Sequence, residues 1–189
     1  MYILVDTLPT LNRFILYVLR ESCMTRIAES GTGNHQIYTD EQRSRRDSTV
    51  WTTVQGVLAP LQFFVFAISS ILLLRYLYTG VGYEMATLSV LLKTAILYTI
   101  MVTGAIWEKV VFDQYLLAPS FFWEDVFSFF VIAAHTGYVV SLFTNLLQPQ
   151  LLVYIALLAY FLYVINAAQF IYKFRIARSG SNKENQVLA

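Results

Sequence analysis

Long apolar stretches alternate with short polar links along this chain of 189 residues. The central parts of four stretches contain only one charged residue, Lys93, and one histidine, His135. Each stretch reaches or approaches the ~20 apolar residues that a helix needs to cross ~30 Å of hydrocarbon. The alternating strands of a membrane barrel are not seen. The pattern therefore predicts four membrane-spanning helices at residues 54–78, 85–107, 124–147 and 151–173.

Two of the links between these stretches are short and contain turn residues. Gly80 and Gly82 lie in the first of them, and Pro149 lies in the link before the fourth stretch. Short connections place successive helices side by side in antiparallel order. The expected fold class is an all-α integral membrane protein, a four-transmembrane-helix bundle.

Lysine and arginine positions predict the orientation of the bundle. Arg43, Arg45 and Arg46 precede the first stretch, and Lys173 and Arg175 follow the fourth, whereas the two short links contain neither residue type. Because such flanks are usually cytoplasmic, both termini are expected in the cytoplasm. The link between the second and third stretches then lies on the same side.

Three segments of the chain differ in character. Residues 38–178 form the expected four-helix membrane domain. Residues 1–37 are an N-terminal extension that we expect to be partly disordered or to form a surface helix, because apolar residues recur at helical spacing within Met1–Arg20. Translation from Met24 is the alternative. Residues 179–189 are polar, and we expect a disordered tail there.

Composition supports the membrane class and excludes several others. The chain is 57% hydrophobic and 13% charged, which is too apolar for an ordinary soluble domain. Its net charge of +1 gives no basic surface for nucleic acid. The single cysteine, Cys23, excludes an intramolecular disulfide, a cysteine-rich zinc site and a CxxCH haem attachment.

Carboxylates at the edges of the apolar stretches are the first candidates for chemistry. Glu108 follows the second stretch, and Glu124 and Asp125 begin the third, beside Trp107 and Trp123. A carboxylate next to hydrocarbon is costly unless it is paired or protonated. We expect these side chains to converge at one end of the bundle with Gln55, Lys109, Asn166 and Gln169. The alternative is interfacial anchoring, in which the tryptophans form an aromatic belt.

Helical spacing connects this end with the interior. Glu124, Ser128 and His135 share one face of the third stretch, and Lys93 and Glu108 share one face of the second. At about 1.5 Å of rise per residue, Lys93 and His135 reach similar depths, so a buried pair is expected. Two alternatives remain: a lysine that is merely bonded to carbonyl groups, and an ion or proton path through a small transporter subunit.

Several ordered blocks resemble the vinyl bacteriochlorophyllide hydratase family. The resemblance extends from Tyr38 to Arg178, and the blocks that carry it are Tyr38–Asp47, Trp51–Phe63, Ile100–Phe112, Phe121–Asp125 and Asn166–Phe170. It implies hydration of the C3-vinyl group of a chlorophyllide or bacteriochlorophyllide to a 1-hydroxyethyl group, a hydro-lyase reaction of bacteriochlorophyll biosynthesis. A scaffold that binds chlorophyllide without chemistry is an alternative.

The implied reaction can be compared with the carboxylates. Markovnikov addition protonates the terminal vinyl carbon, leaves positive charge beside the macrocycle and then adds water there, so the site needs an acid, a negative field and a base. We expect Glu124 or Asp125 to be the acid and Glu108 to be the base or the cation stabiliser. A carboxyl against Trp107 or Trp123 is expected to have a raised pKa and to stay protonated near neutral pH, whereas one paired with Lys109 is expected to stay ionised.

The remaining candidates are assigned to the flat, apolar substrate. His135 is a possible axial ligand to the substrate's magnesium, and the alternative is a core histidine bonded to a neighbouring helix. Lys109, Lys173 or Arg175 is expected to hold the propionate. The expected substrate-binding set is His135, Lys109, Trp107, Trp123, Gln55, Asn166, Gln169 and Lys93.

No cofactor is expected, because the substrate carries its own magnesium. The expected partners are a chlorophyllide-type tetrapyrrole, water and membrane lipid, without nucleic acid. A homo-oligomer and contacts with other pigment-biosynthesis enzymes are left open. The expected location is the cytoplasmic (inner) membrane of a photosynthetic bacterium, with multiple passes.

Overall fold

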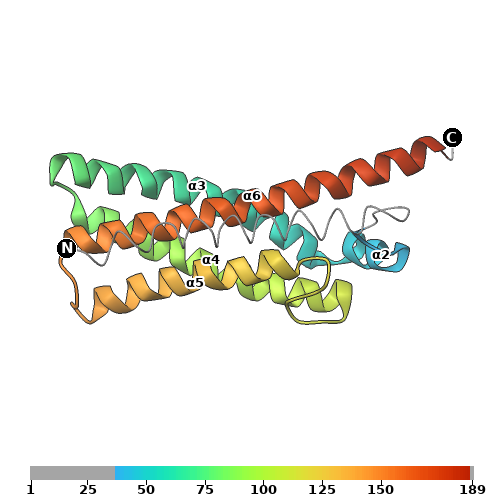
Figure 1. Ribbon diagram of the computed structural model, residues 1–189, viewed down its shortest axis with the longest axis horizontal. Coiled ribbons are helices and arrows are strands. Elements are labelled where there is room, and N and C mark those ends of the chain that lie inside the picture. Colours follow the sequence, from blue (N-terminus) through green and yellow to red (C-terminus); the bar gives the residue numbers. More distant parts are fainter. Residues whose placement is uncertain (1–36, 188–189) are drawn as a thin grey trace, which may run out of the picture. The chain divides into compact units, whose positions relative to one another are not determined.

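The computed structural model describes residues 37–187, and residues 38–176 form one compact unit. Within the described range the chain is helical and has no strand (Figure 1). The predictions for Met1–Arg20 and for a start at Met24 lie outside the described residues. The helices are α2 (Asp40–Ser48), α3 (Val50–Thr79), α4 (Tyr83–Phe112), α5 (Phe122–Phe143) and α6 (Pro149–Val187).

Four of these helices are long and apolar enough to cross a membrane. They are α3, α4, α5 and the part of α6 from Pro149 to Arg175. Large apolar side chains such as Phe64, Ile71 and Phe161 are more than half exposed on them. Such outward apolar surface suits a helix surrounded by lipid. The predicted set of four long apolar helices is confirmed.

Two helix ends differ from the sequence prediction. The second apolar helix continues to Phe112 because its last turn is packed, with Val111 fully buried. The third ends at Phe143 rather than at residue 147, because Asn145 takes a positive φ of 50° that breaks the helix. Glu108 therefore lies inside α4, near its end, and not in the connecting loop, while Glu124 and Asp125 lie in the first turn of α5.

The last helix is also longer than expected. α6 reaches Val187, where we predicted a disordered tail from residue 179. Arg178, Lys183, Glu184 and Gln186 are good helix formers, and they allow the helix to continue beyond its apolar part.

Successive long helices run in opposite directions (Figure 1). As a result, α2 and the loop between α4 and α5 lie at one end of the unit, called the α2 end below, and the two short links lie at the other. The link between α3 and α4 contains Gly80 and Gly82, whose φ angles of 69° and 96° suit glycine.

All four long helices contribute to the core of the unit. Nearer the short links, Leu73, Ala86 and Tyr138 pack together with side chains from α6. Small residues such as Ala86 let membrane helices approach closely. Toward the α2 end, Leu97, Val131 and Tyr163 continue the core.

Candidate active site

Two carboxyl groups meet where α4 ends and α5 begins. The Glu108 and Asp125 side chains are hydrogen-bonded to each other, and the two residues are only 5% and 3% exposed. An ionised carboxylate can accept but cannot donate a hydrogen bond, so one member must carry a proton. Two carboxyl groups in contact and almost closed to water are therefore expected to share one proton, because two negative charges would repel each other there.

Backbone amides of the α4–α5 loop cover this carboxyl pair. The Leu117 N–H donates to Asp125 Oδ2 at 2.6 Å, and the Ala118 N–H donates to Glu108 Oε2 at 3.3 Å. Leu116 and Leu117 have positive φ angles of 55° and 57°, which cost leucine roughly 1–2 kcal/mol each. The loop is thus held in a strained conformation that aims its amides at the two acids.

A third carboxylate is neutralised separately. Glu124 Oε2 lies 2.7 Å from the Lys173 Nζ atom, with the two side chains 3% and 20% exposed. Lys173 also lies over the Phe121 ring, at 5.0 Å from its centroid. This ion pair ties α6 to the first turn of α5, where a carboxylate also suits the helix dipole.

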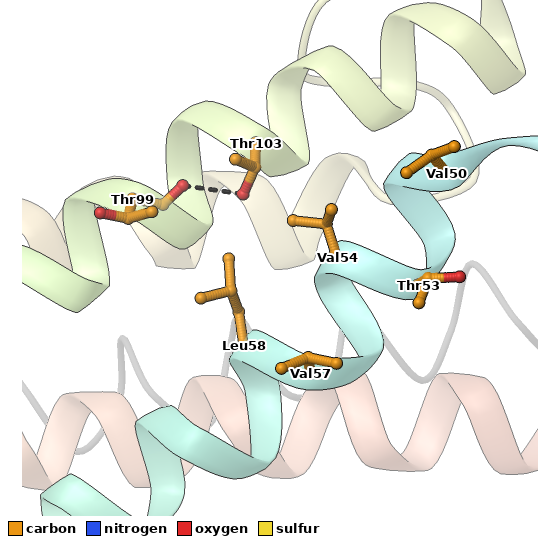
Figure 2. A pocket seen from close by; sticks show the side chains of 7 residues that line it. All are labelled: Val50, Thr53, Val54, Val57, Leu58, Thr99 and Thr103. Carbon is orange, nitrogen blue, oxygen red and sulfur yellow. Dashed lines mark hydrogen bonds between the residues drawn. The ribbon is translucent and has the colours of Figure 1, made fainter.

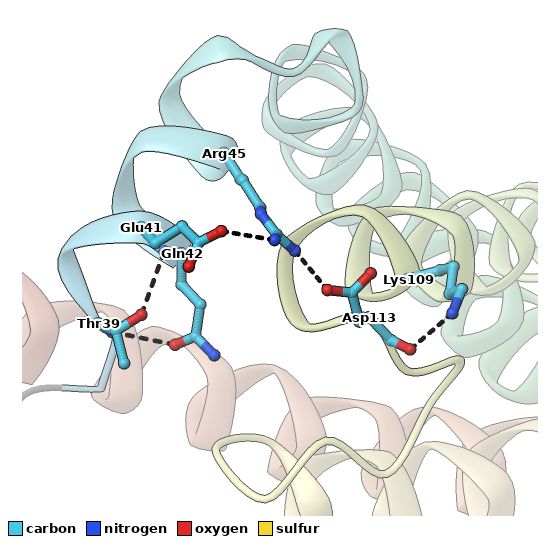
Figure 3. Close-up of polar contacts among 6 residues, drawn as sticks. All are labelled: Thr39, Glu41, Gln42, Arg45, Lys109 and Asp113. Carbon is cyan, nitrogen blue, oxygen red and sulfur yellow. Dashed lines mark hydrogen bonds and ion pairs between the residues drawn. The ribbon is translucent and has the colours of Figure 1, made fainter.

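Lys109 has different neighbours from those we expected. Its Nζ atom donates to the backbone carbonyl of Asp113 at 2.6 Å (Figure 3). Figure 3 also shows Arg45 of α2 joined to Asp113 and Glu41. The hydrogen bond from Arg45 lowers the pKa of the Asp113 carboxyl below its ordinary value. Lys173 rather than Lys109 is thus the cation at a buried site carboxylate, and Lys109 belongs to the rim.

An aromatic cluster lies beside the acids. Trp107 packs edge-on against Phe112 and Phe121, at centroid distances of 5.8 and 5.7 Å. Its indole nitrogen donates to Thr52 Oγ1 at 2.9 Å, which fixes the ring against α3. Tyr38 stacks on Phe112, and burial raises the pKa of the Tyr38 phenol to about 12.

Trp123 lies apart from this cluster. Its ring is half-buried, and it packs edge-on against Phe122 at 5.4 Å. Of the two predicted tryptophans, Trp107 is thus the one that packs into the cluster around Phe121.

Two of the predicted amide side chains form hydrogen bonds between helices. Asn166 Nδ2 donates to Ser128 Oγ at 2.9 Å, and Ser128 in turn donates to the Glu124 carbonyl. Gln55 instead links α3 to α4 through a 2.8 Å hydrogen bond to Thr103. Asn166 is thus joined to the turn that carries the acids, whereas Gln55 lies in the α3–α4 contact.

Lys93 and His135 lie deeper in the bundle. Both are fully buried, and the Lys93 Nζ atom lies 3.7 Å from the centroid of the Tyr163 ring. His135 Nδ1 is 2.8 Å from the Val131 carbonyl of its own helix. The two side chains are close enough to interact electrostatically, but no hydrogen bond joins them within the described chain.

An open groove lies between α3 and α4, toward the α2 end. Figure 2 shows its lining, which is aliphatic apart from threonines: Val50, Thr53, Val54, Val57, Leu58, Thr99 and Thr103. None of the predicted site residues lines it. The groove is therefore separate from the carboxyl cluster.

Sequence reasoning missed two features of this site. The left-handed backbone at Leu116 and Leu117 carries no signal, because leucine rarely adopts it. The pairing of Glu124 with Lys173 did have a signal in the sequence: Lys173 follows Asn166 by seven residues and therefore lies on the same face of its helix.

Comparisons with known proteins give a consistent result. Residues 38–176 match the model of a family described as 2-vinyl bacteriochlorophyllide hydratase. A protein of that name from Rhodobacter capsulatus is 61% identical over 150 residues, which cover 79% of this chain and 86% of the relative. Another from Cereibacter sphaeroides is 66% identical over 146 residues, or 77% and 90% of the two chains. No solved structure matches the chain.

Proposed function

The chain belongs to the 2-vinyl bacteriochlorophyllide hydratase family, and on that basis we propose that it hydrates the C3-vinyl group of a bacteriochlorophyllide-type pigment to a 1-hydroxyethyl group. The reaction adds one water across a carbon–carbon double bond, so the enzyme is a carbon–oxygen lyase. We propose that it uses no cofactor, since the magnesium belongs to the substrate. The observation that carries the chemical part of this proposal is the contact between the two buried carboxyl groups of Glu108 and Asp125.

The pair supplies the acid that vinyl hydration requires. Its shared proton passes to the terminal vinyl carbon, which becomes a methyl group, and positive charge develops on the carbon beside the macrocycle. The two carboxylates left behind stabilise this cation electrostatically. Water then bonds to the cationic carbon, and one of its protons returns to the pair, so that the site is restored for the next turnover.

The arrangement changes the assignment of the acid. Glu124 was one of two expected acids, but its Oε2 atom is engaged by Lys173 at 2.7 Å and does not take part in the contact between the other two carboxyl groups. We therefore assign proton donation to Asp125 and Glu108 together. Glu124, paired with Lys173, holds α6 against the turn that carries Asp125.

Aromatic rings and the loop position the pigment. Trp107 and Phe121 offer apolar faces beside the acids, as a flat macrocycle requires. The acids are buried beneath the amides of Leu117 and Ala118, so substrate entry requires the α4–α5 loop to move. The strain at Leu117 lowers the cost of that movement.

Polar side chains of the remaining expected set have secondary roles. We propose that Asn166 and Gln169 orient water and that Lys173 or Lys109 receives the substrate's propionate at the interface. His135 is bonded to its own helix, fully buried and stacked on Tyr160, so magnesium ligation is not part of this proposal.

We further propose that the α2 end faces the cytoplasm and that both termini lie there. The arginines of α2 and Lys173 support this orientation, because positively charged flanks remain cytoplasmic. The membrane is then the inner membrane of a photosynthetic bacterium.

Isotope incorporation tests the proposed function. Membranes containing the protein are incubated with chlorophyllide a in H₂¹⁸O, and the pigment is analysed by mass spectrometry. A product heavier by one ¹⁸O-labelled water is expected, and membranes without the protein serve as the control. Pigment that binds but stays unchanged would instead identify a scaffold, and absence of binding would contradict both pigment functions.

A further inference from the structure

Several polar atoms inside the bundle have no protein partner. Within the described chain, Lys93 Nζ, His135 Nε2 and the side-chain oxygens of Gln62, Asn166 and Gln169 make no hydrogen bond. Lys93 and His135 are fully buried, and Gln62 and Asn166 are 3% and 8% exposed. An unpaired polar group in such a place carries a full desolvation penalty, so this many together require an explanation.

Hydrogen-bond chemistry identifies most of these atoms as acceptors. The Val131 carbonyl can only accept, so His135 Nδ1 carries the proton and Nε2 presents a lone pair. Ser128 donates its proton to the Glu124 carbonyl and must accept from the Asn166 amide nitrogen, which leaves Asn166 Oδ1 as the unpaired acceptor. Acceptors cannot satisfy one another, and Lys93 is the one donor in the set.

The atoms lie at successive levels of the bundle core. Lys93 and Phe66 both contact the Tyr163 ring, at 3.7 and 5.2 Å. Gln62 precedes Phe66 by about one helical turn, and Asn166 follows Tyr163 by about one turn, so each lies roughly 5 Å nearer the α2 end. The set thus runs from the middle of the bundle toward Asn166 and the acids.

We propose that the bundle core contains a site for ordered water, bound by Lys93 Nζ, His135 Nε2 and the amide oxygens of Gln62 and Asn166. Water suits the site because each molecule supplies two donors and accepts from the lysine. The carbonyl and carboxylate groups of a chlorophyllide are acceptors, so they could pair with the lysine but could not satisfy the amide oxygens of Gln62 and Asn166. Hydration also explains how a lysine is retained at this depth among apolar residues.

The site has a connection to the acids. Asn166 is bonded to Ser128, and Ser128 to the backbone of Glu124, one residue before Asp125. Water held at Asn166 is therefore positioned to supply the molecule that is added to the vinyl group. This second part rests on the proposed function, whereas the existence of the water site does not.

Radiolytic hydroxyl-radical footprinting tests the site without any pigment. X-ray pulses create radicals from bound water in place, so a ring beside internal water is oxidised even when bulk water cannot reach it. The protein is reconstituted in lipid nanodiscs, and oxidation of Tyr163 is compared with that of Tyr38. The two rings are similarly buried, at 7% and 4% exposed, but Tyr38 lies at the α2 end beside Phe112 and Phe121. The Arg46 guanidinium lies over the Tyr38 ring and interacts with its hydroxyl, so this hydroxyl does not require internal water.

The proposal predicts that Tyr163 is oxidised at least threefold faster than Tyr38. Equal or slower oxidation of Tyr163 in the wild-type protein would overturn it. In Asn166→Leu the rate at Tyr163 should fall at least twofold, while Ser70→Ala, which removes a hydroxyl bonded only to its own helix, should leave it unchanged. If Asn166→Leu unfolds, Tyr38 is oxidised faster as well, and the wild-type comparison then decides the result.

The role of this water in the reaction is measured separately. Asn166→Leu is expected to slow ¹⁸O incorporation at least tenfold with little change in pigment binding. Unchanged incorporation would overturn the supply role and leave the hydratase assignment intact. Failure of the wild-type protein to incorporate ¹⁸O would instead contradict the proposed function, whatever the footprinting shows.

Discussion

Replacing Lys173 by methionine should destabilise the bundle by leaving a buried charge without its partner. Glu124 is 3% exposed, and its ion pair with Lys173 is 2.7 Å long. Removing one member of a buried pair costs about 3–5 kcal/mol. Because the Lys173 side chain is 20% exposed, water can partly replace it, so we expect the lower end of the range, about 3 kcal/mol. That value corresponds to roughly a 100-fold change in the folding equilibrium.

The free energy of unfolding can be measured by steric trapping in bicelles. Wild type, Lys173→Met, Glu124→Gln and the double variant form a double-mutant cycle that isolates the pair. The double variant should recover most of the loss, to within about 1 kcal/mol of wild type, since neutral replacements of a buried pair are often tolerated. Lys109→Met is the matched control, because its ammonium group contacts the rim carbonyl of Asp113.

Two results would refute this reasoning. A loss for Lys173→Met no larger than for Lys109→Met would mean that the ion pair contributes nothing to stability. A double variant as unstable as Lys173→Met alone would mean that the lysine acts by packing on Phe121 and not through the charge of Glu124.

Three other substitutions test neighbouring features. Burial raises the pKa of the Tyr38 phenol to about 12, so the buried neutral phenol contributes fully to stability below pH 10, and this contribution is lost as pH rises from 10 through 12. Tyr38→Phe should therefore reduce the fall in Tm over that pH interval. An identical fall in Tm for the variant and the wild type would contradict the burial argument. Trp107→Phe removes the bond to Thr52 and should cost about 1 kcal/mol in the free energy of unfolding, whereas no loss would show that the bond is unimportant. Ser69→Ala removes the hydroxyl that lies 2.6 Å from the Tyr160 hydroxyl, and it should lower the free energy of unfolding by about 1–3 kcal/mol. A variant as stable as the wild type would contradict this prediction.

Much of the fold was predictable because the lipid solvent imposes simple rules. A membrane segment must satisfy its backbone internally and present apolar side chains, so the four long stretches could be identified as helices from composition alone. Helix ends were less predictable. The end of α5 depends on a positive φ at Asn145, and that of α4 on the burial of Val111, which are properties of the folded chain.

The candidate site was predictable as a set of residues but not as a set of partners. Carboxylates at the ends of apolar stretches identified Glu108, Glu124 and Asp125. Which acid shares a proton and which is paired depends on the angle at which α4, α5 and α6 meet, and the sequence does not encode that angle locally. The structure joins Glu108 to Asp125 and pairs Glu124 with Lys173.

The most direct test of the central claim is the turnover of pigment by Asp125→Asn and Glu108→Gln, with pigment binding measured in the same membranes. Loss of the shared proton should lower turnover at least about 100-fold in each variant, as for removal of a general acid, while binding changes little. Asp113→Asn is the matched control, because it alters an exposed carboxylate at the rim and should retain near-normal turnover. Normal turnover in both Asp125→Asn and Glu108→Gln would contradict the assignment of the carboxyl pair as the acid.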